Sequence, residues 1–355
     1  MHWLNWRSIS AAAAYVGAAI GAGLFSGRES AQFFIPFGHM GMHAAFSTIP
    51  LFAVAGSLIL YISWRQGAVC YRDFLLWYLP GQLVSLLDYT LSFFLFCTIA
   101  IMGAGAGALL AGISGISPAW GTVALLTFTA IILFFGRDGF LRANAGMVLV
   151  LIVIILLVAN SHGVSWVPTQ DIGDIGTINW GLTPRCWLAS SIVYAGYNVA
   201  LSLPLLVTLG GGLRSAGEAW VAGIGGGVIL GLMVVILSGT LISNAPLALI
   251  TPIPMLLVVR KVGDWAIQAY IIGMLLALAT TAVASAYALA HRLTSHYPPV
   301  EKWAGLALVF LALPFSTLGF MSLVRTVYPL LGYAAILLIV AAGLFGLCRL
   351  TVHKL

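Results

Sequence analysis

The residues best suited to chemistry in this chain are uncharged and lie in three apolar stretches. The first, GAAIGAGLFSG, carries Gly17, Gly21 and Gly23 within seven residues. A glycine in a helix interior costs about 1 kcal/mol relative to alanine, so the three together predict an interrupted helix. Carbonyls freed by the interruption would bind a cation, and freed amides at 24–26 would face an anionic group. The alternative is close helix packing through the Gly17–x–x–x–Gly21 spacing.

The second stretch, YAGYNVALSLP, runs from Tyr194 to Pro204 and again combines helix-weakening residues with polar ones. Proline removes one backbone hydrogen bond, and Gly196 weakens the same helix further. We therefore predict a second interruption, with Tyr194, Tyr197 and Asn198 lining a substrate cavity. The alternative is a simple proline kink without a binding role.

The third stretch, ALATTAVAS, spans 277–285 and contains Thr280 and Thr281. Hydroxyl and carbonyl oxygens are the ligands that a dehydrated monovalent cation prefers, and such a site needs no charged residue. The alternative is that both hydroxyls bond back to carbonyls one turn earlier on their own helix.

Glu29 is the acidic residue nearest to the first interruption, and Arg28 precedes it. An ionisable group at membrane depth is a functional candidate by default, so both residues are predicted to serve a gate or a proton path. The alternative places Glu29 in an outer vestibule, paired with Arg28, Arg325 or water.

The composition requires a lipid environment for the chain. Of its 355 residues, 61% are hydrophobic and only 7% are charged, against about 25% charged in ordinary soluble domains. Basic residues are scattered singly, without the run or face that nucleic-acid binding needs. No nucleophile lies in a pattern with a base, so we predict neither an enzyme nor an organic cofactor.

About twenty apolar residues span a bilayer as a helix, and ten segments meet that requirement. The first and sixth, which contain the two interruptions, take corresponding positions in two halves of five. Five is odd, so the second half would enter the membrane from the opposite side, as an inverted repeat. We predict one all-α polytopic transporter domain over 1–355, with repeats at about 8–160 and 185–348. The ten segments are 8–38, 40–64, 82–110, 118–135, 145–159, 186–209, 221–241, 266–290, 303–321 and 327–347.

The connections are predicted to hold a turn at 136–144, a polar segment at 162–184, and short helices within 71–79 and 243–265. Glycines repeating every four residues in the seventh segment, Gly223, Gly227 and Gly231, indicate close helix packing.

Lys and Arg predict the orientation, because cytoplasmic loops carry an excess of them. With the N-terminus inside, ten basic residues fall on the cytoplasmic side and five on the other. Both termini of this multi-pass plasma-membrane protein are therefore predicted to be cytoplasmic. The cytoplasmic group is Arg7, Arg65, Arg72, Arg137, Arg142, Arg214, Arg292, Lys302, Arg349 and Lys354.

Three motifs, GAAIGAGLFSGRESAQFF, ALATTAVAS and GFMSLVRTVYPLLGY, resemble the YkvI-like family of bacterial membrane proteins. This family is similar to the amino acid–polyamine–organocation superfamily, which has the LeuT fold. The resemblance implies alternating access around the first and sixth helices. It also implies a sodium site made by the matching residues Gly17, Ile20, Ala277, Thr280 and Thr281. The family's usual SGQE is SGRE here, with Arg28 in place of glutamine.

The predicted function is secondary transport of a small solute, an amino acid or a related amine, coupled to Na+ by alternating access. Substrate would contact Gly21, Gly23, Tyr194, Tyr197 and Asn198. Two alternatives stay open: proton-coupled transport through Glu29, and a ligand-sensing permease homologue that signals without net transport. The expected partners are the small-molecule substrate and membrane lipid, with no nucleic acid.

Overall fold

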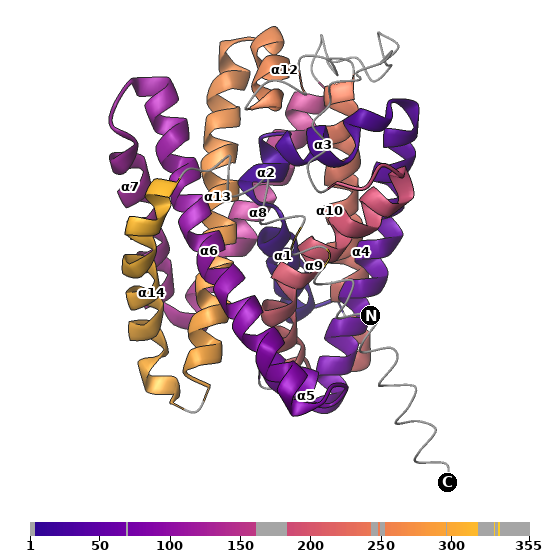
Figure 1. Ribbon diagram of the computed structural model, residues 1–355, viewed down its shortest axis with the longest axis vertical. Coiled ribbons are helices and arrows are strands. Elements are labelled where there is room, and N and C mark those ends of the chain that lie inside the picture. Colours follow the sequence, from indigo (N-terminus) through magenta and orange to yellow (C-terminus); the bar gives the residue numbers. More distant parts are fainter. Residues whose placement is uncertain are drawn as a thin grey trace.

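The computed structural model describes residues 4–68, 70–160, 183–242, 253–295 and 297–318, together with the single positions 248, 330 and 333. Within these ranges the regular structure is helical (Figure 1). The α-helices of the first half are α1 (Trp6–Ala19), α2 (Ala22–Phe25), α3 (Arg28–Phe33), α4 (His39–Gln66), α5 (Tyr71–Leu76), α6 (Gly81–Ser114), α7 (Pro118–Phe134) and α8 (Gly136–Ala159). Those of the second half are α9 (Trp187–Gly210), α10 (Ala216–Ile242), α12 (Pro254–Val262), α13 (Asp264–Leu293) and α14 (Glu301–Phe315). Short 3-10 turns lie at Ile35–Phe37, Pro298–Val300 and Ser316–Leu318.

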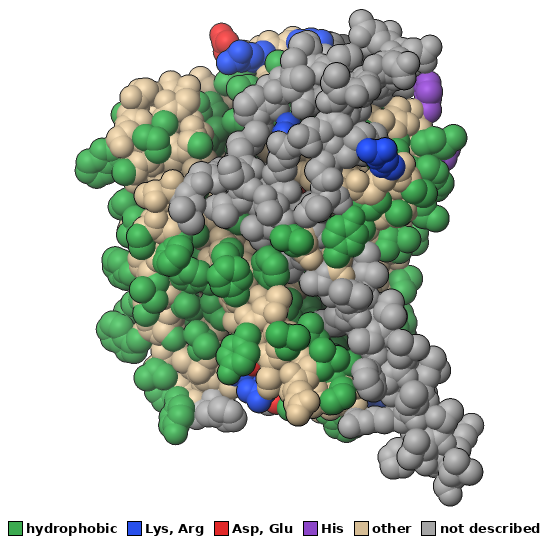
Figure 2. All heavy atoms as spheres, in the orientation of Figure 1, with side chains coloured by type: hydrophobic (Ala, Val, Ile, Leu, Met, Phe, Trp, Pro, Cys, Tyr) green, Lys and Arg blue, Asp and Glu red, His purple; other side chains and the backbone are tan. Residues whose placement is uncertain are grey.

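Six of these helices, α4, α6, α8, α9, α10 and α13, are long and apolar enough to cross a membrane. Large apolar side chains cover their outward faces, among them Phe93 of α6 and Leu149 of α8, each more than 60% exposed, and Phe310 of α14 is exposed to the same degree. Figure 2 shows apolar side chains over the middle of one face, with the coloured charged side chains near its two ends. Since such a surface is unfavourable in water, this band faces lipid.

The predicted segments agree with the helices to within a few residues at 40–64, 82–110, 118–135, 221–241 and 266–290. The predicted short helices correspond to α5 and α12. The ninth segment corresponds to α14 and a following 3-10 turn. The tenth segment at 327–347 and the polar connection at 162–184 lie almost wholly outside the described residues.

The predicted turn at 136–144 is wrong, because α8 already begins at Gly136. Gly136 has a φ of 67°, which lets α7 reverse directly into α8 within one residue. Arg137 and Asp138 suggested a polar loop, but they are exposed on the first turn of α8 instead.

The predicted interruption of the sixth segment is also wrong, because α9 is continuous through Gly196 and Pro204. Its polar side chains bond back onto the same helix. Asn198 Nδ2 donates to the Tyr194 carbonyl at 3.1 Å, and Ser202 Oγ donates to the Asn198 carbonyl at 2.8 Å. Burial on nearly every side outweighs the hydrogen bond lost at the proline. Only the first segment is discontinuous among the described helices.

Corresponding helices of the two halves pack against each other in pairs: α1 with α9, α4 with α10, α6 with α13, and α7 with α14. The short helices α5 and α12, which follow α4 and α10, lie at opposite ends of the molecule (Figure 1). The opposite placement of α5 and α12 is what an inverted repeat requires, because its two halves run in opposite directions through the membrane.

The α4–α10 contact is the closest packing between the halves. A Cβ added at Gly223, Gly227 or Gly231 would collide with α4 backbone at Ser57, Ala53 or Ile49. The predicted packing role of these glycines is therefore confirmed, since they let the two backbones approach within van der Waals contact.

The end that carries α5 is held by an ion pair between α6 and α13. Arg292 Nε donates to Asp88 Oδ1 at 2.9 Å, and the second guanidinium nitrogen pairs with Oδ2. Arg72 of α5 reaches the same carboxylate at 3.7 Å. Since Asp88 is only 5% exposed, this bidentate pair fixes α5 and α6 to α13 at a buried charge.

Candidate substrate and cation site

The interruption of the first segment lies at Ile20 and Gly21, between α1 and α2. Ile20 has φ −79° and ψ 87°, which is not helical. Gly21 donates its N–H to the Ala19 carbonyl at 3.0 Å. The Gly17 carbonyl therefore loses the N–H that a continuous helix would supply from Gly21.

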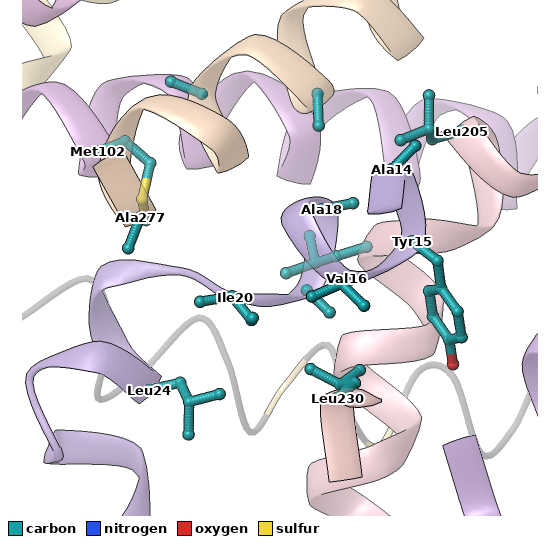
Figure 3. Close-up of a cluster of buried hydrophobic side chains, with 14 of the residues drawn as sticks. Ala14, Tyr15, Val16, Ala18, Ile20, Leu24, Met102, Leu205, Leu230 and Ala277 are labelled. Atoms are coloured by element: carbon teal, nitrogen blue, oxygen red, sulfur yellow. The ribbon is translucent and has the colours of Figure 1, made fainter. Parts of the chain in front are cut away.

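Thr281 of α13 supplies the missing partner. Its hydroxyl, 2% exposed at the residue level, lies 3.2 Å from the Gly17 carbonyl oxygen and 2.8 Å from that of Ile20. Figure 3 shows Ile20 on the non-helical stretch beside α13, which carries Ala277. Two carbonyls of the first segment and one hydroxyl of the eighth thus meet at one buried point.

The other two residues of the predicted sodium set behave differently. Thr280 Oγ1 donates to the Ala277 carbonyl at 3.0 Å, within α13 itself. For Thr280 the back-bonded alternative therefore describes this structure, whereas Thr281 reaches across to another helix. The structure brings together Gly17, Ile20 and Thr281. Thr280, the residue before Thr281, bonds instead to the carbonyl of Ala277, about one turn earlier on α13.

These donors fit an alkali cation better than a transition metal. Carbonyl and hydroxyl oxygens are hard, neutral ligands. Within the described ranges no group of three His, Cys, Asp or Glu residues comes together as a metal cluster. These oxygen atoms also meet at the interruption after α1, where backbone carbonyls lack their helical hydrogen bonds. Cation sites in discontinuous membrane helices use such carbonyls.

Asn144 of α8 is a neighbour of this point that the sequence analysis missed. Its Nδ2 donates to the Ala13 carbonyl at 2.9 Å. Its Oδ1 is buried without a hydrogen-bond partner, and a Cβ at Gly17 would collide with the amide. An asparagine inside a membrane helix is a signal in itself, but the predicted turn at 136–144 concealed it.

Glu29 lies at the interruption rather than in an outer vestibule. It is 2% exposed, and its Oε1 lies so close to Gly23 that a Cβ there would collide with it. Its carboxylate lies near the side chains of Tyr194 and Tyr197 and near the Leu24 backbone. Oε2 is buried without a hydrogen-bond partner, as is the Tyr194 hydroxyl.

Three aromatic rings pack together beside this carboxylate. The rings of Phe33 and Tyr194 are 5.4 Å apart, those of Phe33 and Tyr197 5.8 Å, and those of the two tyrosines 5.4 Å. We call Glu29, Phe33, Tyr194 and Tyr197 the acid–aromatic cluster. It joins the broken first segment to the continuous α9.

Three of the five predicted substrate residues meet at this cluster, namely Gly23, Tyr194 and Tyr197. Gly21 lies at the interruption and donates to the Ala19 carbonyl. Asn198 is buried but directs its amide to its own helix. Arg28 is partly buried at the start of α3, next to Glu29 in sequence.

A cavity of about 380 Å³ lies among the N-terminal turns of α1, the first turns of α8 and the end of α9. Three basic side chains, Arg7, Arg137 and Arg142, line it together with Asp138. Arg7 Nη1 also donates to the Gly212 carbonyl at 3.4 Å. All three arginines belong to the side predicted to be cytoplasmic.

Two bacterial proteins are similar to this chain over nearly its whole length. The chain is 25% identical over 324 residues to the membrane protein YkvI of Bacillus subtilis, covering 91% of each chain. It is 27% identical over 335 residues to the B. subtilis protein YyaD, covering 93% of this chain and 94% of YyaD. No family model matches the chain.

Solved structures of transporters share the fold. A Na+-coupled sialic acid symporter in a substrate-bound outward-open state has a TM-score of 0.66 at 14% identity, covering 93% of this chain and 77% of that one. MhsT in complex with L-phenylalanine has a TM-score of 0.65 at 16% sequence identity, covering 97% of this chain and 89% of MhsT. The nucleobase-cation-symport-1 transporter Mhp1, in a closed conformation, has a TM-score of 0.63 at 15% sequence identity, covering 94% of this chain and 77% of Mhp1.

The fold is therefore that of the LeuT-type secondary transporters, an all-α membrane architecture. Over nearly its whole length the chain is similar to YkvI and YyaD, as its sequence motifs predicted. The solved proteins that share this fold are transporters.

Proposed function

We propose that this protein is a secondary active transporter of a small solute, coupled to sodium by alternating access. The observation that carries the proposal is the Thr281 hydroxyl, which bridges the two carbonyls of Gly17 and Ile20 at the interruption. The likeness to Na+-coupled and other cation-symport proteins supports the same class of function.

Sodium would be held by the carbonyls of Gly17 and Ile20 and by Thr281 Oγ1, after the hydroxyl turns a lone pair toward the ion. The other two residues of the predicted set are on the same helix: Thr280 directly precedes Thr281, and Ala277 lies about one turn earlier. A cation at this point would tie the first segment to α13. Its departure would leave α1 free to move, which is the coupling that alternating access needs.

The proposed substrate is an amino acid or a related amine, bound next to the interruption at Gly21, Gly23, Tyr194, Tyr197 and Asn198. The acid–aromatic cluster supports this proposal, because it supplies one carboxylate and several ring faces in a buried space. MhsT, a structural neighbour, was solved with L-phenylalanine.

We propose that both termini are cytoplasmic and that the α5 end of the molecule faces the cytoplasm. Arg72, Arg292 and Lys302 lie toward this end or in its loops, in keeping with the excess of basic residues on that side. The cavity beside α1, with its three arginines, would then open toward the cytoplasm.

Proton coupling through Glu29 is the second candidate, favoured by the burial of its carboxylate and the unpartnered Oε2 atom. A buried carboxylate beside a substrate site is suited to carry a proton. The two candidates differ in which ion gradient drives uptake.

The test is uptake by purified protein in liposomes, with sodium replaced by choline at fixed pH. The proposal expects uptake to fall at least tenfold without sodium. It expects the same loss in Thr281→Val, while Thr129→Val, which alters a buried hydroxyl bonded to Leu125 on α7, keeps its sodium dependence. Uptake unaffected by choline but abolished by collapsing the proton gradient would favour Glu29. Saturable binding without accumulation would favour a sensing role instead.

A further inference from the structure

The carboxylate of Glu29 is buried without a partner for one of its oxygens, and this requires an explanation. Glu29 is 2% exposed, and Oε2 accepts no hydrogen bond from the described residues. Removing a carboxylate from water costs several kcal/mol unless a proton, a cation or donors compensate. No basic side chain is among the groups that interact with it in the described part of the chain.

Glu29 is also held in position from both sides of α3. Ser238 of α10 donates its hydroxyl to Ser30 at 3.1 Å, and Ser190 of α9 donates to the Phe33 carbonyl at 2.8 Å. These contacts fix the short helix on two long ones. The carboxylate is therefore directed at Gly23 by the fold, and not by a flexible chain end.

The surroundings of the carboxylate favour an organic cation over a bare metal ion. The side chains of Tyr194 and Tyr197 lie beside it, and the Phe33 ring packs against both tyrosine rings. An ammonium group gains both from a carboxylate and from neighbouring aromatic faces. Gly23 has no side chain, so Oε1 of Glu29 packs directly against the backbone next to the helix interruption.

We infer that Glu29 binds the ammonium group of the substrate, within the acid–aromatic cluster and against Gly23. The site then selects amines and amino acids over their deaminated acids, because a substrate carboxylate at this point would meet Glu29. This inference rests on the proposed transport function and names the part of the substrate that the cluster recognises.

The test uses full-length purified protein in detergent, with ligand binding followed by thermal stabilisation and calorimetry. The probes are L-phenylalanine, phenethylamine and 3-phenylpropanoate, with the matched series L-leucine, isoamylamine and 4-methylpentanoate. We expect stabilisation by members that carry an ammonium group and none by the two deaminated acids.

Glu29→Gln tests the residue itself. A hydrogen bond to a charged group contributes about 1.5–3 kcal/mol, so the affinity for the amine probes should fall by about 10- to 100-fold. Glu301→Gln is the control. It removes a carboxylate on α14 that pairs with His291 of α13, and it should leave the affinity unchanged. If Glu29→Gln does not fold, Gly23→Ala gives the same information, because its Cβ must displace Oε1 of Glu29.

Three results would overturn the inference: unchanged affinity in Glu29→Gln or Gly23→Ala, equal binding of the deaminated acids, or no binding of any ammonium probe to the wild type. Glutamine imitates a protonated carboxyl, so a pure proton carrier predicts the first of these. The proposed transport function can fail while this inference stands. In that case amines would bind in a way that depends on Glu29, but the protein would not accumulate them in liposomes.

Discussion

The first and sixth spans hold equivalent positions in the two halves, yet one is broken and the other is continuous. The first span stops at Ala19 and resumes at Ala22, whereas α9 passes through Gly196 and Pro204 without stopping. Both contain residues that weaken a helix. The composition of each span therefore does not decide which of the two helices is interrupted.

The difference lies in where the polar partners come from. At the interruption, Thr281 on α13 donates to the carbonyls that α1 has released. In α9 the side chains of Asn198 and Ser202 turn back to carbonyls of the same helix. A break persists where a neighbouring helix satisfies the freed groups, and a helix persists where its own side chains and its packing stabilise it.

The largest expected effect comes from removing the partner of the broken span. Thr281→Val keeps the shape of the side chain but removes the one hydroxyl proton that the buried Gly17 and Ile20 carbonyls share. An unsatisfied buried group costs about 1–3 kcal/mol, so we expect the free energy of unfolding in detergent to fall by about 1–3 kcal/mol. Thr129→Val, whose hydroxyl bonds only within α7, should cost less than 1 kcal/mol. Equal losses in the two variants would contradict the idea that Thr281 holds the break.

A smaller effect is expected where Asn144 packs on α1. In Gly17→Ala the new methyl group collides with the Asn144 amide, and such overpacking costs about 1–3 kcal/mol. Alanine regains about 1 kcal/mol of helix propensity, so the net loss of stability should be about 0–2 kcal/mol. Gly146→Ala on α8 meets no atom within 4 Å and should stabilise the protein instead. Thermal unfolding of both variants shows whether each gains or loses stability. If both are stabilised, Asn144 does not pack against Gly17 as described.

The smallest effect is expected in the continuous span. Pro204→Ala restores the N–H that the proline lacks, and one hydrogen bond contributes about 1 kcal/mol net, so α9 should gain about that much stability. Chemical denaturation measures this gain, and Pro50→Ala in α4 is the matched control for a proline inside a helix. A clear loss of stability in Pro204→Ala alone would mean that α9 needs its proline and resembles the first span more than its continuity suggests.

Much of the site could be anticipated from residue types. Glycines at Gly17 and Gly21 indicated the interruption, and the paired threonines indicated oxygen donors on the eighth span. The residue types alone did not reveal which threonine crosses to the first span. Side-chain direction decided it, because Thr281 faces the Gly17 and Ile20 carbonyls while Thr280 bonds to Ala277. The same limit applied to Glu29, whose burial depends on how α3 folds over Gly23.

The sequence by itself determined that this protein is helical and solvated by lipid, and where most of its long helices begin and end. These properties follow from local composition, since 7% charged residues cannot cover a protein in water and apolar runs of about twenty residues span a bilayer. Only the tertiary structure decided that α9 stays whole, that Asn144 packs on Gly17, and that Glu29 meets Tyr194 and Tyr197. Each depends on contacts between segments far apart in the chain, and such contacts are set by packing and not by local propensity.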